Sequence, residues 1–142
     1  MGGVRVFASV IAIALLAGIV AVSAGAKVGR TAKLPSQLVG SWTHFFTAAY
    51  WSRAGITDEH AEHLSLYVPA DGNVALGEIY IRFTPLSGNR LAISGRFPDC
   101  SKTKSLYRWK VANRRLTLTK LQDNCNESAA TFDGVVWSRE GT

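Results

Sequence analysis

The sequence predicts an all-β fold, a small antiparallel up-and-down β-barrel with one short helical turn near the C-terminus. Between residues 63 and 139, short segments alternate apolar and polar side chains, which is the period of half-buried strands. Turn-forming residues such as Asp71-Gly72 and Ser87-Gly88 separate these segments. Four Trp, four Tyr and six Phe supply ample bulk for the core of such a barrel.

The 142 residues have room for one domain and a targeting segment. Residues 4–22 are almost wholly apolar with a single charge, Arg5, near their start, and small residues follow at 23–26. This layout is typical of a secretory signal peptide, so we expect cleavage near residue 26 and a periplasmic or extracellular location. An uncleaved membrane anchor is the alternative, because about 18 apolar residues can span a bilayer. Residues 27–37 would then be a flexible basic tether, and residues 38–142 the barrel domain.

The first strand is expected at residues 38–46, where Trp, Thr and Phe are frequent. Trp42 would close one end of the barrel. Gly40 has no side chain, so a neighbouring strand or the Trp42 ring can approach it closely. Residues 47–56 form a longer connection, which is either a lid that turns Tyr50 and Trp51 toward the barrel mouth or a loop whose aromatic rings fill the core.

The later strands follow from alternation and turns. Pro85 is expected to end one of them, and Gly95 to mark a bulge or bend in the next. A helical turn is expected within residues 123–132, where Asp and Asn precede two Ala. The expected strands are 64–68, 78–84, 91–97, 107–111, 116–119 and 135–139.

Cys100 and Cys125 are the only two cysteines. An even pair in an exported chain indicates a disulfide bond, and the absence of a Cys-x-x-Cys spacing argues against a metal or redox pair. On the chain-entropy model, closing a loop of this size is worth about 3.5 kcal/mol.

The sequence contains three histidines, which are candidate ligands. His44 shares a strand face with Trp42, so it would enter the cavity if that face is interior; otherwise it is a hydrogen-bonded core residue. His60 and His63 lie in the polar run 58–63, but the spacing fixes no third ligand. We therefore expect a solvated turn there, with no metal site and no cofactor.

Residues 102–122 contain seven basic side chains and no acidic one, in a chain with a formal net charge of +6. This predicts a hairpin that attracts anions, such as phospholipid head groups, acidic polysaccharide or an acidic protein; the alternative is a solubilising face. Export argues against nucleic acid as the partner. The expected anion-binding patch is Lys102, Lys104, Arg108, Lys110, Arg114, Arg115 and Lys120.

The sequence contains no arrangement that indicates an enzyme. There is no nucleophile elbow, the carboxylates are scattered, and no glycine-rich phosphate loop occurs. We therefore predict a non-enzymatic protein.

Residues 34–42, Leu-Pro-Ser-Gln-Leu-Val-Gly-Ser-Trp, resemble the opening of a lipocalin-type (calycin) barrel, in which Gly-x-Trp starts the first strand. Residues 107–109, 116–119, 123–125 and 137–139 resemble small exported bacterial lipocalin-like domains. The resemblance implies a barrel with an apolar cavity and an arginine near the end that packs across the first-strand tryptophan, here Arg139. The second lipocalin motif, with Thr-Asp-Tyr, is absent.

The resemblance favours an exported binding protein that holds a small apolar or amphiphilic molecule. One alternative is a protein–protein module, such as an exported protease or hydrolase inhibitor that blocks its target with residues 25–33. Another is an envelope protein that docks on anionic surfaces through the basic hairpin. The candidate lining residues are His44, Tyr50, Trp51, Tyr67 and Tyr80.

Overall fold

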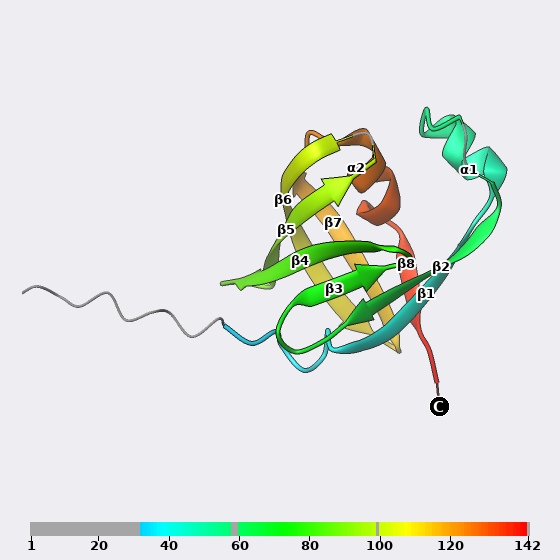
Figure 1. Cartoon of the computed structure of the whole chain (residues 1–142). Helices are drawn as coiled ribbons and strands as arrows, with labels where there is room; N and C mark the ends of the chain where they lie inside the picture. The colour runs from blue at the N-terminus through cyan, green and yellow to red at the C-terminus, as the bar shows by residue number, and fades with distance from the viewer. Residues whose placement is uncertain (1–31, 58–59, 99, 142) are drawn as a thin grey trace, which may run out of the picture.

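The computed structural model describes residues 32–57, 60–98 and 100–141, which form a closed antiparallel barrel whose eight strands follow one another in chain order (Figure 1). The up-and-down barrel expected from the alternation is therefore confirmed. The strands are β1 (Gly40–Phe46), β2 (Glu62–Val68), β3 (Asn73–Leu76), β4 (Ile79–Leu86), β5 (Arg90–Phe97), β6 (Cys100–Ala112), β7 (Arg115–Gln122) and β8 (Val136–Arg139). Two short helices, α1 (Ala48–Arg53) and α2 (Asn126–Phe132), complete the fold, and α2 confirms the expected helical turn.

The expected signal peptide and residues 27–31 of the expected tether lie outside the described residues. Within the described ranges, no helix is long and apolar enough to cross a membrane.

The barrel interior is a packed core. Inward side chains from alternate strand positions are buried, and the largest of them include Trp42, Trp137 and Tyr107. From α2, Phe132 enters this core, and its ring centroid lies 6.0–6.2 Å from those of Phe83, Phe97, Tyr107 and Trp137. Side chains of the described residues thus fill the middle of the barrel.

The chain closes one end of the barrel just before β1. Trp42 is fully buried there, and its Nε1 donates a hydrogen bond of 2.9 Å to the Leu38 carbonyl. The strands β1 and β8 meet at this end, with Trp42 opposite Arg139. Gly40 has a φ of +141°, and a Cβ on it would lie 3.0 Å from Arg139 Nη1. A group does approach Gly40 closely, as predicted, but it is the Arg139 side chain and not a neighbouring strand or the Trp42 ring.

Both helices lie at the opposite end. Figure 1 shows α1 beyond the tip of the β1–β2 pair and α2 over the end of the barrel. A disulfide bond ties this end together, with the sulfur atoms of Cys100 and Cys125 2.07 Å apart. It joins the start of β6 to the residue that precedes α2. The predicted pairing of the two cysteines is therefore confirmed.

Two elements, β3 and α1, were not predicted, and one local expectation was wrong. Residues 73–76 form β3, which pairs with β2 and β4. Pro85 does not end β4; it pairs with Leu91, and the strand continues to Leu86. Residues 47–56 contain helix α1, which begins where the Thr47 hydroxyl accepts the Tyr50 N–H. A shift in the β5–β6 register between Gly95 and Phe97 confirms the irregularity expected at Gly95.

Candidate functional site

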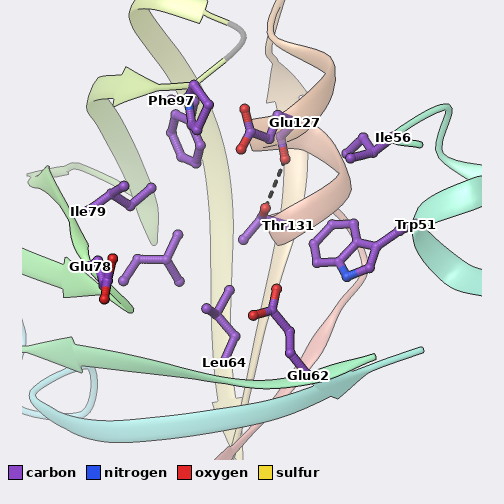
Figure 2. A pocket seen from close by; sticks show the side chains of 11 residues that line it. Trp51, Ile56, Glu62, Leu64, Glu78, Ile79, Phe97, Glu127 and Thr131 are labelled. Carbon is purple, nitrogen blue, oxygen red and sulfur yellow. Dashed lines mark hydrogen bonds between the residues drawn. The ribbon is translucent and has the colours of Figure 1, made fainter. Parts of the chain in front are cut away.

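A pocket of about 260 Å³ lies at the helical end of the barrel (Figure 2). Figure 2 shows Trp51 and Ile56 on one side of it, and Ile79 and Phe97 on the other. Thr131 of α2 lies between these sides. The lining residues are Trp51, Ile56, Glu62, Leu64, Leu76, Glu78, Ile79, Phe97, Pro98, Glu127 and Thr131.

The walls of the pocket are mainly apolar, and they are formed where strand ends and the sides of the helices meet. Leu64 and Ile79 are half-buried and pack against the core, whereas Leu76 and Phe97 belong to the core itself. Ile56 comes from the chain just after α1. An apolar wall of this kind excludes water from one side of a ligand and supplies most of its affinity.

Three carboxylates also line the pocket. Glu62 starts β2, Glu78 lies in the turn between β3 and β4, and Glu127 belongs to the first turn of α2. Glu62 and Glu127 are half-buried, and Glu78 is exposed. In Figure 2 these carboxylates surround the space from three different elements.

Trp51 forms the α1 side of the pocket and is only 3% exposed. Its ring stacks on Phe46 with centroids 4.4 Å apart, which fixes the indole against the core. Its Nε1 is buried and has no hydrogen-bond partner within the part of the chain that the structure describes. A buried indole N–H without an acceptor is uncommon and costs free energy unless a ligand or water accepts it.

Of the residues predicted to line a cavity, Trp51 alone lines this pocket. Tyr50 lies beside it, but its hydroxyl donates to the Ala130 carbonyl at 2.6 Å. Burial raises the pKa of Tyr50, and the charge of Asp133 raises it further. Tyr50 therefore ties α1 to α2 and keeps the two helices in place around the pocket.

Tyr67 and Tyr80 were predicted to line the cavity, but they do not line this pocket. They are 55% and 79% exposed on the outer face of the barrel. The reason is the phase of each strand, because Leu66 and Ile81 occupy the inward positions next to them.

His44 is half-buried, and its Nδ1 lies 2.8 Å from the Val136 carbonyl. Its ring centroid lies 4.4 Å from that of Phe46. It therefore occupies the hydrogen-bonded position that was the alternative to a ligand role, and it does not line the pocket.

Sequence reasoning missed the three glutamates. Glu62 carried a usable signal, because it is in phase with Leu64, Leu66 and Val68 on the inward face of β2. The positions of Glu78 and Glu127 carried no such signal. Glu78 lies in a turn and Glu127 in a short helix, and neither gives a sequence period that shows which side chains face the pocket.

The described part of the basic patch lies on the outside of the barrel. Arg108 and Lys110 occupy outward positions of β6, and Arg108 is joined there by Arg90 through the β5–β6 pairs. The side chain of Lys102 lies outside the described residues. Six patch residues are exposed: Lys104, Arg108, Lys110, Arg114, Arg115 and Lys120.

Two features shape the patch. Lys120 forms an ion pair with Asp133 at 3.9 Å, so its charge is partly compensated. A shallow hollow of about 540 Å³ lies between Lys110 and Arg115 on the β6–β7 hairpin.

The polar run around His60 and His63 forms no metal site within the described ranges, where no three potential ligands are grouped. His63 is exposed, with its ring 4.7 Å from that of Phe45 on the outer face. Asp58 and Glu59 lie outside the described residues.

The fold and the pocket together define a closed eight-stranded barrel with a packed interior and a small end pocket. Comparisons of the chain with protein-family models, with curated proteins and with solved structures found no match.

Proposed function

We propose that this chain is an exported, non-enzymatic binding protein that holds a small apolar or amphiphilic molecule in the pocket at the helical end. The observation that carries the proposal is the pocket itself, which combines apolar walls with a few polar groups. Small-molecule sites usually have this composition. The lipocalin-like resemblance agrees with the proposal, although the ligand would sit at the barrel end and not inside the barrel.

The disulfide bond supports export, because such bonds persist mainly in oxidising compartments. A periplasmic or extracellular location is therefore part of the proposal, together with removal of the apolar segment before residue 27.

Native mass spectrometry of the protein from its exported fraction tests both parts. Excess mass that disappears on denaturation would be a carried ligand. The denatured mass would show whether the chain is cut after Ala24 or Ala26, the two small-residue sites. An unprocessed chain of full mass would contradict cleavage, and the absence of excess mass would count against a tightly held ligand.

A pocket-filling variant locates the ligand. Leu64→Trp adds bulk to the pocket wall, whereas Leu86→Trp adds the same ring on the outer face of β4, where Leu86 is 41% exposed. We expect the first variant to lose the excess mass and the second to retain it. Equal retention by both variants, each shown to be folded by circular dichroism, would place the ligand elsewhere.

A second candidate function is docking on an anionic surface. The exposed cations of the β6–β7 hairpin favour it, because Arg108, Lys110 and Arg115 are exposed and the last two line the shallow hollow. Clustered charge of one sign attracts oppositely charged surfaces over about a Debye length, and salt weakens that attraction.

Co-sedimentation with phosphatidylglycerol vesicles tests this candidate. We expect binding at low salt, loss at high salt, and loss in the double variant Arg108→Glu/Lys110→Glu. The matched control is Lys33→Glu/Arg53→Glu, which changes the net charge equally at exposed positions away from the hairpin. Equal loss in the control would show that only net charge matters.

A further inference from the structure

We infer that the shallow hollow on the β6–β7 hairpin binds a terminal phosphate, the charged group of a phosphate monoester. The inference rests on the second candidate function, docking on an anionic surface, and names the group that this surface recognises. The hollow lies where Arg115 pairs with Ser138, next to the pair formed by Trp42 and Arg139. Its lining shares no residue with the pocket at the helical end, so the two sites are tested separately.

Four outward side chains of the hairpin form a square with the cations on one diagonal. Lys110 pairs directly with Thr117. Further along β6, Ala112 pairs directly with Arg115. Lys110 and Arg115 are therefore diagonal neighbours, with Cα atoms about 7–8 Å apart in such a ladder. The small side chains of Ala112 and Thr117 occupy the other diagonal and leave the hollow between the two long cations. An anion placed there meets a positive charge on each side.

Two neutral side chains add hydrogen-bond donors to the hollow. Thr117 supplies a hydroxyl, and Asn113, in the turn between β6 and β7, supplies an amide. The φ angles of Asn113 and Arg114 are +49° and +60°, as in the tight two-residue turn that holds two strand ends together. A terminal phosphate carries a charge of about −1.5 to −2 at pH 7 and three strong acceptor oxygens. It therefore matches two cations flanked by neutral donors.

The charges of the two cations are not compensated within the described part of the chain. There, neither Lys110 nor Arg115 takes part in an ion pair or a side-chain hydrogen bond. Other cations of the hairpin are engaged, because Lys120 pairs with Asp133 and Arg114 donates to a backbone carbonyl near the C-terminus. The described lining of the hollow includes no acidic side chain, and the sequences of β5, β6 and β7 contain no Asp or Glu. This one-sign surface attracts anions.

The test is a titration of the oxidised protein with methyl phosphate at constant ionic strength, followed by backbone amide resonances in nuclear magnetic resonance spectra. We expect the largest shifts in residues 110–117. Methyl phosphate should bind at least about threefold more tightly than dimethyl phosphate, because the diester has a lower charge and fewer terminal oxygens.

A charge variant and its control assign the effect to the hollow. Lys110→Gln removes a cation of the hollow. Lys104→Gln removes the same charge from the same face of β6, about 20 Å away along the strand. We expect Lys110→Gln to weaken methyl phosphate binding about two- to fivefold, as for an exposed ion pair. Lys104→Gln should leave it unchanged.

A shape variant leaves every charge in place. Ala112→Leu fills the floor of the hollow, whereas Ala92→Leu adds the same bulk on the outer face of β5. We expect the first variant to lose methyl phosphate binding and the second to retain it. Circular dichroism shows whether each variant is folded, and the comparison of Lys110→Gln with Lys104→Gln does not depend on the result.

Co-sedimentation with vesicles distinguishes a lipid head group from a soluble phosphate. Phosphatidate vesicles present a monoester and phosphatidylglycerol vesicles a diester, each at a lipid content that gives the same surface potential. A preference for phosphatidate that Ala112→Leu removes would assign the hollow to a lipid. Binding of methyl phosphate without that preference would assign it to a soluble phosphate.

The outcomes separate the inference from the function on which it rests. If Lys110→Gln binds methyl phosphate as tightly as Lys104→Gln does, or if the diester binds as tightly as the monoester, the hollow is not a terminal phosphate site. Salt-dependent binding to phosphatidylglycerol vesicles would still support docking on an anionic surface. If methyl phosphate shifts no resonance of the hairpin and neither kind of vesicle binds, both proposals fail.

Discussion

The guanidinium carbon of Arg139 lies 4.4 Å from the centroid of the Trp42 ring. Its Nη1 and Nη2 also donate hydrogen bonds to the carbonyls of Val39 at 3.1 Å and Gln37 at 2.6 Å. One side chain at the end of β8 therefore holds the first-strand tryptophan and the segment that leads into it. The lipocalin-like resemblance implied this contact, and the structure contains it.

Replacement of Arg139 should destabilise the barrel. Arg139→Ala removes a cation–π contact worth about 1 kcal/mol. It also removes two hydrogen bonds worth about 1 kcal/mol each, so we expect a loss of about 2–3 kcal/mol in the free energy of unfolding. Urea denaturation measures it. Arg108→Ala, at an exposed outer position, should change stability by less than about 0.5 kcal/mol. Equal effects of the two variants would contradict a structural role for Arg139.

Gly40→Ala should be costlier than the same change at another glycine with positive φ. A Cβ at Gly40 meets Arg139 Nη1 at 3.0 Å, and the φ of +141° is itself unfavourable for alanine. Gly88, with a φ of +69°, has no atom within 4 Å of an added Cβ. We expect Gly40→Ala to lose about 2–4 kcal/mol and Gly88→Ala about 1–2 kcal/mol, as measured by thermal and urea unfolding.

A double variant shows whether the arginine causes that difference. In an Arg139→Ala background the clash partner is absent, so the added cost of Gly40→Ala should fall toward that of Gly88→Ala. An unchanged cost would assign the effect to backbone strain alone.

Alkaline pH should destabilise the protein through Tyr107. Burial raises the pKa of Tyr107, and its hydrogen bond to the Asp123 carboxylate raises it further. The folded state therefore keeps a proton that the unfolded state begins to lose near pH 10, as an ordinary tyrosine does. Stability should be constant below that pH and fall above it by as much as about 1.4 kcal/mol per pH unit for this group.

Two variants identify the group. Tyr107→Phe should reduce the alkaline slope, with the remainder coming from Tyr50, whose pKa is also raised. Tyr80→Phe makes the same change at a side chain that is 79% exposed and should leave the slope as it was. Urea unfolding between pH 8 and pH 11 (about the range that spans the usual tyrosine pKa) measures each slope. A slope unaffected by Tyr107→Phe would contradict the assignment.

Reduction of the disulfide should lower stability by about 3.5 kcal/mol on the chain-entropy model. The Cys100→Ser/Cys125→Ser variant should show a similar loss without a reductant. Ser128→Ala, which changes a buried hydroxyl in the first turn of α2, controls for disturbance of the helix. A double-serine variant as stable as the oxidised protein would show that the bond does not constrain the unfolded chain.

The fold was predictable because alternation and turn residues are local signals. Ser87-Gly88-Asn89 and Ala112-Asn113-Arg114 each connect strands that pair directly, so the sequence order is also the order in the barrel. The strand β3 was missed because four residues between Gly72 and Gly77 are too few to establish a period. Pro85 was misjudged because a proline is tolerated near a strand end when its missing N–H is not required for pairing.

The site was much less predictable than the fold. The alternation that placed Leu66 inward also placed Tyr67 outward, so a tyrosine-lined cavity conflicted with an apolar core in the same strand. The pocket joins Trp51, Glu62, Glu78 and Glu127, which are far apart in sequence and meet only when the barrel closes and α2 docks. Trp51 was found because an aromatic pair in a long connection was a visible signal.

The last strand carries a further consequence. β8 is four residues long and pairs with both β1 and β7. If a protease removed it, β1 and β7 would each expose a row of unpaired backbone N–H and C=O groups, and Trp137 would leave the core. Such open edges recruit strands from other molecules. Trimming at the C-terminus would therefore convert the closed barrel into an open sheet that is prone to aggregation.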